Sequence, residues 1–361
     1  MSDETVGSWV GLDAAGVTGG LQFQQVTPKA WDEDDVDVKI MYCGICASDY
    51  GVLKGEYAPL EPRVGGHEIV GEVVRVGPKV ANLKVGDMVG VGWQCDACRE
   101  CDLCKNKDDQ YCAGITWTLG LKYGRGAAKG TMSHGGFAKM WRGASRYAVK
   151  LPASLDPGNA APLLCAGVTV YSPMKTYGAG TTRKRVGVIG IGGLGHAAVL
   201  IAKAMGAQVT AISRGEAKKA DALALGATTY ISTGKDLKED FKGHENSLDL
   251  IICTINPDVL PVADYLSLLA PKGLIVVVGI VLTPLAVPTI PLIIGGRGVV
   301  GSNIGSPEDI ADLFALAAEK DIKLWVQRWN MDDINKAMVD FGDGKPNYRY
   351  VLVNTDNGGK M

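Results

Sequence analysis

Four cysteines lie close together in the sequence, at Cys98, Cys101, Cys104 and Cys112, with the spacing C-x2-C-x2-C-x7-C. Four thiolates this close can surround one tetrahedral Zn²⁺ ion at about 2.3 Å. Such a site has no open coordination position, so the metal would brace a loop and take no part in chemistry. Cys95 opens a second register, in which Cys95, Cys98, Cys101 and Cys104 bind the ion. The spacing alone leaves both registers open.

The same cysteines could form disulfides, which belong to oxidising compartments. The first residues, Met1 to Asp13, lack the basic segment and the following apolar segment of a secretory signal. We therefore expect a cytoplasmic protein whose cysteine cluster binds zinc.

Three isolated residues, Cys46, His67 and Cys165, could hold a second zinc ion. Cys46 ends a C-x2-C pair that begins at Cys43, and His67 is followed by Glu68. Two thiolates and one imidazole leave a fourth position for water or substrate, which is typical of a catalytic zinc. The pair Cys43 and Cys46 could also be a redox pair or half of a zinc ribbon.

A glycine-rich segment with the pattern G-x-G-x-x-G predicts a dinucleotide site. It follows the apolar run Arg185–Ile189 and precedes a helix-like segment, His196–Ala204, which is the context that the pattern requires. The glycines let the backbone approach a pyrophosphate at the start of the helix. The residues expected to bind the cofactor here are Gly190, Gly192, Gly193, Leu194 and Gly195.

The end of the next apolar run, Gln208–Ile212, selects between cofactors. An acidic residue there would hydrogen-bond the ribose 2′-OH of NAD. This chain has Ser213 and Arg214 instead, with Lys218 a few residues further on and Glu216 adding some contrary charge. A hydroxyl and two basic groups can bind a 2′-phosphate, so the sequence predicts NADP(H).

Two kinds of element must position these residues. The first part of the chain has short alternating runs separated by turn residues, which predict an antiparallel, barrel-like β domain. After about residue 157, apolar strands alternate with helix-like segments, which indicates βαβ units on a parallel sheet. The expected strands are Val36–Tyr42, Ile69–Val74 and Asp87–Val91 in the first part, and Arg185–Ile189, Gln208–Ile212, Leu248–Cys253 and Leu274–Val278 in the second.

The composition fits two globular domains, with 361 residues, 47% of them hydrophobic, and 48 glycines. A net charge of -2 without a basic block makes nucleic acid an unexpected partner. The apolar segment Gly273–Ile294 is interrupted by prolines and is therefore expected to form buried strands, not a membrane span. The tail from Asn357 to Met361 is expected to be disordered.

Taken in order, these motifs resemble the zinc-dependent medium-chain alcohol dehydrogenases from about Asp32 to Val353. The stretch Cys165–Met174 and the serine-basic segment after Ile212 are most similar to the NADP-dependent cinnamyl alcohol dehydrogenase branch. The resemblance implies a GroES-like β-barrel catalytic domain made of residues 1–157 and 304–361. It also implies a Rossmann NADP-binding domain, a doubly wound parallel sheet, made of residues 158–303.

The resemblance also implies roles for individual residues. Cys46, His67 and Cys165 match the ligands of a catalytic zinc, and Glu68 matches a neighbour that can enter the metal's shell. Asp49 matches a carboxylate that orients the ligand histidine, and Ser48 matches the hydroxyl that starts a proton relay. The four residues matching the structural zinc ligands are Cys98, Cys101, Cys104 and Cys112, which decides against the register with Cys95. Further residues expected to contact the cofactor are Thr169, Gly279, Ser302 and Asn303.

The implied activity is reduction of aldehydes, aromatic or medium-chain and cinnamaldehyde-like, to primary alcohols with NADPH, and the reverse, with two Zn²⁺ ions per chain. Ala47 and Gly51 stand where many plant members carry histidines, which weakens the case for a lignin precursor as substrate. A homodimer is expected through an edge strand around Leu292–Ile294. Two other classes remain open: a zinc-independent quinone-type or enal reductase of the same superfamily, and a non-enzymatic zinc- or redox-sensing protein.

Overall fold

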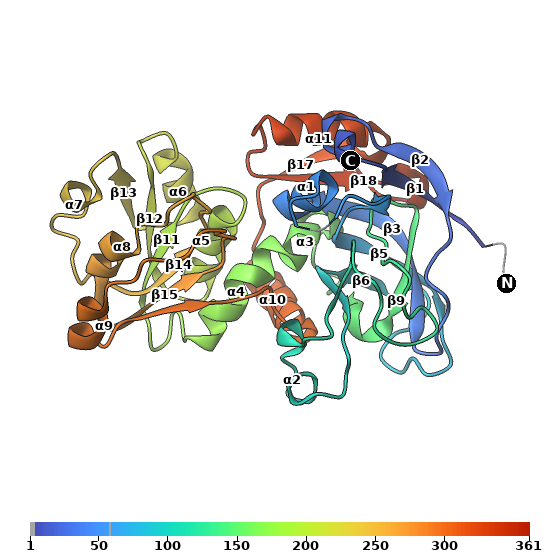
Figure 1. Ribbon diagram of the computed structural model, residues 1–361, viewed down its shortest axis with the longest axis horizontal. Helices are drawn as coiled ribbons and strands as arrows, with labels where there is room; N and C mark the ends of the chain where they lie inside the picture. Colours follow the sequence, from blue (N-terminus) through green and yellow to red (C-terminus); the bar gives the residue numbers. More distant parts are fainter. Residues whose placement is uncertain (1–3, 58) are drawn as a thin grey trace. The chain divides into compact units, whose positions relative to one another are not determined.

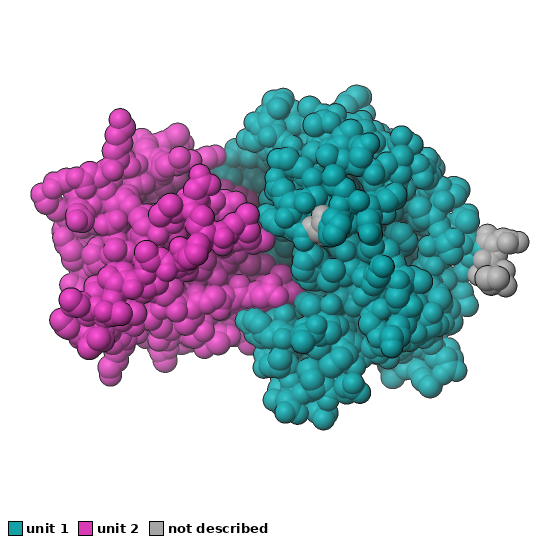
Figure 2. All heavy atoms as spheres, in the orientation of Figure 1, with its two compact units in different colours: residues 1–165, 305–361 teal, residues 166–304 magenta. Residues whose placement is uncertain are grey.

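The computed structural model describes residues 4–57 and 59–361. The chain divides into two compact units, coloured separately in Figure 2. Unit 1 consists of residues 1–165 and 305–361, and unit 2 consists of residues 166–304. The chain therefore leaves unit 1, builds unit 2 and returns.

Unit 1 is built on a seven-stranded sheet with the order β10-β6-β5-β3-β18-β17, in which β9 also pairs with β3. Its strand pairs are antiparallel except for β17 and β18, which run parallel. Two small sheets, β2-β1-β4 and β7-β8, complete the unit. Its strands are β1 (Val6–Gly11), β2 (Gln22–Val26), β3 (Asp35–Ile45), β4 (Arg63–Val64), β5 (Glu68–Val76), β6 (Met88–Val91), β7 (Gln94–Asp96), β8 (Thr116–Trp117), β9 (Met140–Ala144), β10 (Val149–Lys150), β17 (Val326–Asn330) and β18 (Arg349–Val353).

The long strand β3 organises unit 1. Its apolar residues Val36, Val38 and Ile40 are fully buried, and β-branched side chains of this kind pack well on a pleated surface. β3 pairs with β5, β9 and β18, so segments far apart in sequence meet along it. The three strands predicted for this part of the chain are confirmed as β3, β5 and β6.

The helix α1 starts directly where β3 ends. Cys46 is its N-cap, and the Asp49 side chain completes a capping box by accepting from the Cys46 backbone. The helix stops at Gly55, whose φ of 85° is strained for a residue with a side chain. The helices of unit 1 are α1 (Ala47–Lys54), α2 (Asp102–Lys105), α3 (Pro157–Ala160), α10 (Pro307–Lys320) and α11 (Ile334–Gly342).

Unit 2 is a six-stranded parallel sheet with the order β13-β12-β11-β14-β15-β16, with helices alongside it (Figure 1). This is the predicted parallel sheet of βαβ units, and the predicted strands are confirmed as β11, β12, β14 and β15. Its strands are β11 (Arg185–Ile189), β12 (Gln208–Arg214), β13 (Thr229–Thr233), β14 (Leu248–Cys253), β15 (Leu269–Val277) and β16 (Gly298–Gly301). Its helices are α4 (Ala166–Thr176), α5 (Gly195–Ala204), α6 (Lys219–Leu225), α7 (Leu237–Asp240), α8 (Val262–Leu268) and α9 (Thr289–Gly295).

Three expectations were wrong. The segment Gly273–Ile294 does not form buried strands throughout: its first residues belong to β15, but the rest is a largely exposed loop followed by α9, because proline cannot donate a hydrogen bond to a strand ladder. Leu292–Ile294 is not an edge strand: it lies in α9, because Pro288 caps this helix at its start and Gly296, in a left-handed conformation, ends it. The strand at this edge of the sheet is β16, a few residues later, and β13 forms the opposite edge. The C-terminal tail is also ordered, because the Asn357 side chain donates to the carbonyls of Ile40 at 2.8 Å and Lys139 at 2.7 Å.

In the part of the chain that the structure describes, no helix is both long enough and apolar enough to cross a membrane.

Candidate active site

Four side chains in unit 1 bring their ligand atoms to within 4.8 Å of one another: Cys46, His67, Glu68 and Cys165. Antiparallel pairing of Gly44 with Glu68 sets the end of β3 beside the start of β5, which brings Cys46 to His67. Cys165 follows a short 3-10 helix, Ala161–Leu164. The Sγ atoms of Cys46 and Cys165 are 3.9 Å apart, and all four residues are buried.

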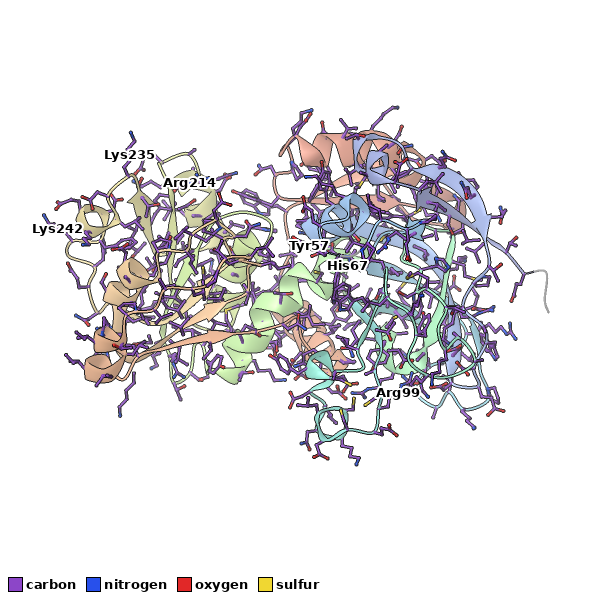
Figure 3. All side chains as sticks on the ribbon, viewed as in Figure 1. Tyr57, His67, Arg99, Arg214, Lys235 and Lys242 are labelled. Carbon is purple, nitrogen blue, oxygen red and sulfur yellow. The ribbon has the colours of Figure 1, made fainter. Side chains whose placement is uncertain are left out.

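Asp49 fixes the orientation of His67, which is labelled in Figure 3. Its Oδ1 lies 2.8 Å from Nδ1 of His67 and accepts from the backbone N–H of Gly66 at 2.8 Å, while Oδ2 accepts from that of Cys46 at 2.9 Å. The opposite ring nitrogen, Nε2, is buried with no hydrogen-bond partner among the described residues. Burial lowers the pKa of His67, but the charge and hydrogen bond of Asp49 outweigh it and raise the pKa to about 10. The Nε2 atom is therefore available to bind a cation held between the four side chains.

Glu68 is paired with Arg349, a residue 281 positions away that the sequence analysis missed. Both side chains are buried, and Glu68 Oε2 has no hydrogen-bond partner within the described ranges. A Cβ at Gly44 would lie 1.9 Å from Oε2, so only glycine leaves room for this carboxylate. Burial raises the pKa of Glu68 to about 7, against the opposing charge of Arg349. A basic residue at the start of the apolar strand β18 was the signal available in the sequence.

The pKa values of the Cys46 and Cys165 thiols are shifted in opposite directions. A hydrogen bond with Cys165 holds the pKa of Cys46 well below its ordinary value, against the effect of burial. The same contact, together with burial, raises the pKa of Cys165 well above its ordinary value. One sulfur is therefore ready to serve as a thiolate, and a bound cation would favour ionisation of the other.

Aromatic rings line one side of this cluster. The Trp93 ring meets the His67 ring edge-on, with centroids 4.7 Å apart, and Trp117 lies 5.0 Å from Trp93. Ser48, on the first turn of α1, is half-buried two residues after Cys46. The Ser48 hydroxyl therefore lies on the helix that follows Cys46, and the Trp93 ring contacts the His67 ring.

The cysteine cluster forms a second compact set in unit 1. Four Sγ–Sγ distances lie between 3.5 and 3.9 Å, far longer than the roughly 2.05 Å of a disulfide. All nine cysteines lie within the described residues, and none forms a disulfide. The clustered residues are Cys98, Cys101, Cys104 and Cys112.

Cys95 stands apart from this cluster. Its Sγ contacts the backbone oxygen of Trp117 at 3.3 Å and the hydroxyl of Tyr123 at 3.8 Å, and burial raises its pKa to about 12. In contrast, backbone N–H groups lower the pKa of Cys98 to about 6. The geometry therefore favours the register that excludes Cys95.

In unit 2, the glycine-rich turn joins β11 to α5 as predicted. A Cβ at Gly195 would lie 1.7 Å from the carbonyl oxygen of Gly190, so the strand and the helix can approach this closely only with glycine there. Gly192 has open space where a Cβ would be, which leaves its backbone accessible. Thr254, which the sequence analysis missed, donates to the carbonyls of Ile189 at 2.8 Å and Gly190 at 3.0 Å. Gly193 and Leu194 complete the turn before α5.

The other predicted cofactor residues are spread over unit 2. Ser213 and Arg214 end β12, and Lys218 directly precedes α6. Gly279 lies against the backbone of Ile255: a Cβ at Gly279 would be 2.2 Å from the Ile255 carbonyl oxygen. The remaining predicted residues are Thr169, within α4, and Ser302 and Asn303, just after β16.

Two family models match this chain. The alcohol dehydrogenase GroES-like domain matches residues 32–153, and the zinc-binding dehydrogenase domain matches residues 193–319. The fold is therefore a GroES-like β domain with a Rossmann parallel-sheet domain, as predicted. The class of protein that this fold and site define is the alcohol dehydrogenases, oxidoreductases that interconvert aldehydes and alcohols.

Relatives place the chain more narrowly. A probable cinnamyl alcohol dehydrogenase of Oryza sativa subsp. japonica is 41% identical over 95% of this chain and 94% of that protein. A cinnamyl alcohol dehydrogenase structure from Sorghum bicolor has a TM-score of 0.89, with 36% identity and 99% of both chains covered. The structure of CAD from Helicobacter pylori complexed with NADP(H) has a TM-score of 0.85, with 30% identity, covering 97% of this chain and 98% of that one. The chain belongs to the cinnamyl alcohol dehydrogenase family.

Proposed function

We propose that this enzyme reduces aldehydes, aromatic or medium-chain and cinnamaldehyde-like, to primary alcohols with NADPH, and catalyses the reverse reaction. In this proposal, unit 1 is the catalytic domain and unit 2 is the NADP-binding domain. The observation that carries it is the buried set of Cys46, His67, Glu68 and Cys165, in which Asp49 leaves the imidazole Nε2 free. Two thiolates and one imidazole are the donors of a catalytic zinc that keeps an open position.

The residues present fit zinc. Two sulfurs bound at about 2.3 Å with a tetrahedral angle lie roughly 3.8 Å apart, and the Cys46 and Cys165 sulfurs are 3.9 Å apart. Unpartnered ligand atoms on His67 and Glu68 support the same assignment. Spacings of 3.5–3.9 Å in the cysteine cluster support a second, structural ion. We therefore propose two zinc ions per chain.

Each residue then has a defined task. When bound, zinc supplies Lewis-acid polarisation of the substrate oxygen, and NADPH supplies the hydride. Asp49 holds His67 in the tautomer that presents Nε2. Arg349 balances the charge of Glu68, which keeps that carboxylate ready beside the ligands. The Ser48 hydroxyl donates a proton to the substrate oxygen as the alcohol forms, and takes it back in the reverse reaction.

The preference for NADPH is supported by the residues at the end of β12. Arg214 is exposed, and no ion pair with it occurs in the described ranges, so its guanidinium is available for a phosphate. The last residues of β12 are Ser213 and Arg214, so no acidic residue stands at the strand end where an NAD enzyme would bind the ribose 2′-OH. The Trp93–Trp117 pair beside His67 supports an aromatic substrate, because offset rings attract one another.

The proposed assembly is a homodimer. β16 pairs on one side only, with β15, and such an edge is an aggregation hazard unless something covers it. Three isoleucines of the adjoining helix α9 are strongly exposed: Ile290 (67%), Ile293 (79%) and Ile294 (84%). A two-fold axis would cover both features at once with closed symmetry.

Metal analysis combined with steady-state assays tests the proposal. We expect two zinc ions per chain, turnover of cinnamaldehyde with NADPH, and loss of both activity and one ion in Cys46→Ser. Arg214→Asp should weaken NADPH far more than NADH, because it replaces a charge-assisted pair with repulsion. Protein that reduces the aldehyde equally well after complete zinc removal would instead support a zinc-independent reductase.

A further inference from the structure

In unit 2, residues of the neighbouring strand β13 hydrogen-bond the turn that follows β12. β13 is the edge strand of the sheet and runs parallel to β12, with Ser213 opposite Ser232 and Arg214 opposite Thr233. The turn begins at Gly215, which has a φ of 61° and no atom within 4 Å of the position that a Cβ would take. No packing contact therefore fixes the backbone at Gly215 on this side, and hydrogen bonds hold it.

Two such bonds reach Gly215 from β13. The Gly215 N–H donates to the backbone carbonyl of Thr233 at 3.0 Å, a bond that does not depend on the type of side chain. The Tyr230 hydroxyl donates to the Gly215 carbonyl at 2.6 Å. Burial raises the pKa of Tyr230, and the Ser213 side chain opposes that rise. The phenol thus holds the residue that directly follows Arg214.

The charges around residues 213–215 favour binding of an anion. Glu216, the acid closest to it in sequence, is paired with Lys219 at 3.0 Å. That pair, helped by Ser232, lowers the pKa of Glu216. Arg214 extends from this end of unit 2, where Lys235 is also labelled (Figure 3). The acid is partly neutralised while Arg214 stays available.

We propose that Tyr230 is a positioning residue for recognition of the cofactor's 2′-phosphate, because it holds the Ser213–Gly215 segment in the conformation that presents Ser213 and Arg214. The inference rests on the proposed use of NADP(H). Its physical basis is preorganisation: a binding segment that is already ordered loses less conformational entropy when the phosphate arrives. NADH has no 2′-phosphate, so its binding depends little on this segment.

The test is direct binding of NADPH and NADH to the full-length protein, followed by cofactor fluorescence. Tyr230→Phe removes only the hydroxyl, so we expect the Kd for NADPH to rise about fivefold, the value of one net hydrogen bond. The Kd for NADH should change less than about twofold, within the range expected for uncoupled sites. Tyr177→Phe is the matched control, because Tyr177 is another half-exposed tyrosine of unit 2, and both Kd values should stay at wild type.

A double-mutant cycle separates positioning from a general effect on folding. If Tyr230 acts through Ser213 and Arg214, adding Tyr230→Phe to a variant that carries both Ser213→Ala and Arg214→Ala should weaken NADPH binding less than about twofold further. Additive losses, equal losses for both cofactors, or no loss in Tyr230→Phe would each overturn the assignment of Tyr230. Equal affinity of the wild-type protein for NADPH and NADH would instead refute the proposed cofactor preference on which the inference rests.

Discussion

Replacing Asp49 by asparagine should loosen the catalytic zinc without disturbing the structural one. The carboxylate accepts three hydrogen bonds, from the backbone N–H groups of Cys46 and Gly66 and from Nδ1 of His67. Asparagine keeps the shape but has only one oxygen. If that oxygen faces Gly66 and His67, the new NH₂ group meets the N–H of Cys46, and two buried donors then face each other.

The opposite orientation of the amide has a larger effect on the metal site. The NH₂ group would then face Nδ1, which favours the tautomer with the proton on Nε2, and that nitrogen could no longer bind zinc. Both orientations also remove the negative charge that supports the imidazole. Loss of a carboxylate partner of this kind typically weakens metal binding about 10- to 100-fold, which corresponds to about 1.4–2.7 kcal/mol.

Competition with a chromophoric chelator measures this change. Asp49→Asn should release one zinc ion at a chelator concentration about 10- to 100-fold lower than wild type requires, while the second ion stays bound. Asp35→Asn is the control, because Asp35 is also buried in unit 1, is paired with Lys29 at 2.6 Å and contributes no ligand atom to either cluster. Its zinc content should be unchanged even if its stability falls. The reasoning would be refuted if Asp49→Asn held both ions as tightly as wild type and kept its activity.

Three further perturbations follow from the structure. Cys101→Ser should lose the structural zinc and unfold at a lower temperature. Cys95→Ser should keep both ions, because Sγ of Cys95 contacts Trp117 and not the cluster. Equal zinc loss in both variants would instead support the register in which Cys95 is a ligand. Ile293→Lys should give monomers near the 38.0 kDa chain mass in light scattering. The fold should be retained, because the Ile293 side chain is 79% exposed. A dimer that persists in this variant would exclude α9 from the interface. Burial raises the pKa of Asp109, but bonds from Arg146 and Tyr147 outweigh it and hold the pKa below its usual value. Asp109 therefore stabilises the fold at pH values above about 4, and this contribution is lost as the pH falls through the folded-state pKa. At pH 7, Asp109→Asn should lower the free energy of unfolding by about 1–3 kcal/mol, and denaturant titrations should show this gap close in acid.

The strands and the glycine-rich turn were predictable because their signals are local. Alternating runs such as Val36–Tyr42 and the apolar run Arg185–Ile189 determine their own conformation and face. Leu292–Ile294 misled the analysis because a short apolar run does not distinguish a strand from a helix. The prolines at 288 and 291 indicate breaks between strands when the sequence is considered alone, but a helix tolerates proline in its first turn.

The contacts that complete the site could not be predicted in the same way. Spacing indicates the cysteine cluster, and the family resemblance indicates Cys46, His67 and Cys165, yet nothing near Glu68 in sequence indicates Arg349. The partnership arises because the chain returns to unit 1 after residue 304 and inserts β18 next to β3, which also pairs with β5, the strand that carries Glu68. The return has an electrostatic consequence: two thiolates would balance a divalent zinc ion, so Glu68 would add an uncompensated buried negative charge. Removing one partner of such a buried pair typically costs about 3–5 kcal/mol. The C-terminal segment thus does more than extend the sheet, since the first residue of β18 supplies the cation that allows the Glu68 carboxylate to lie beside the proposed metal ligands.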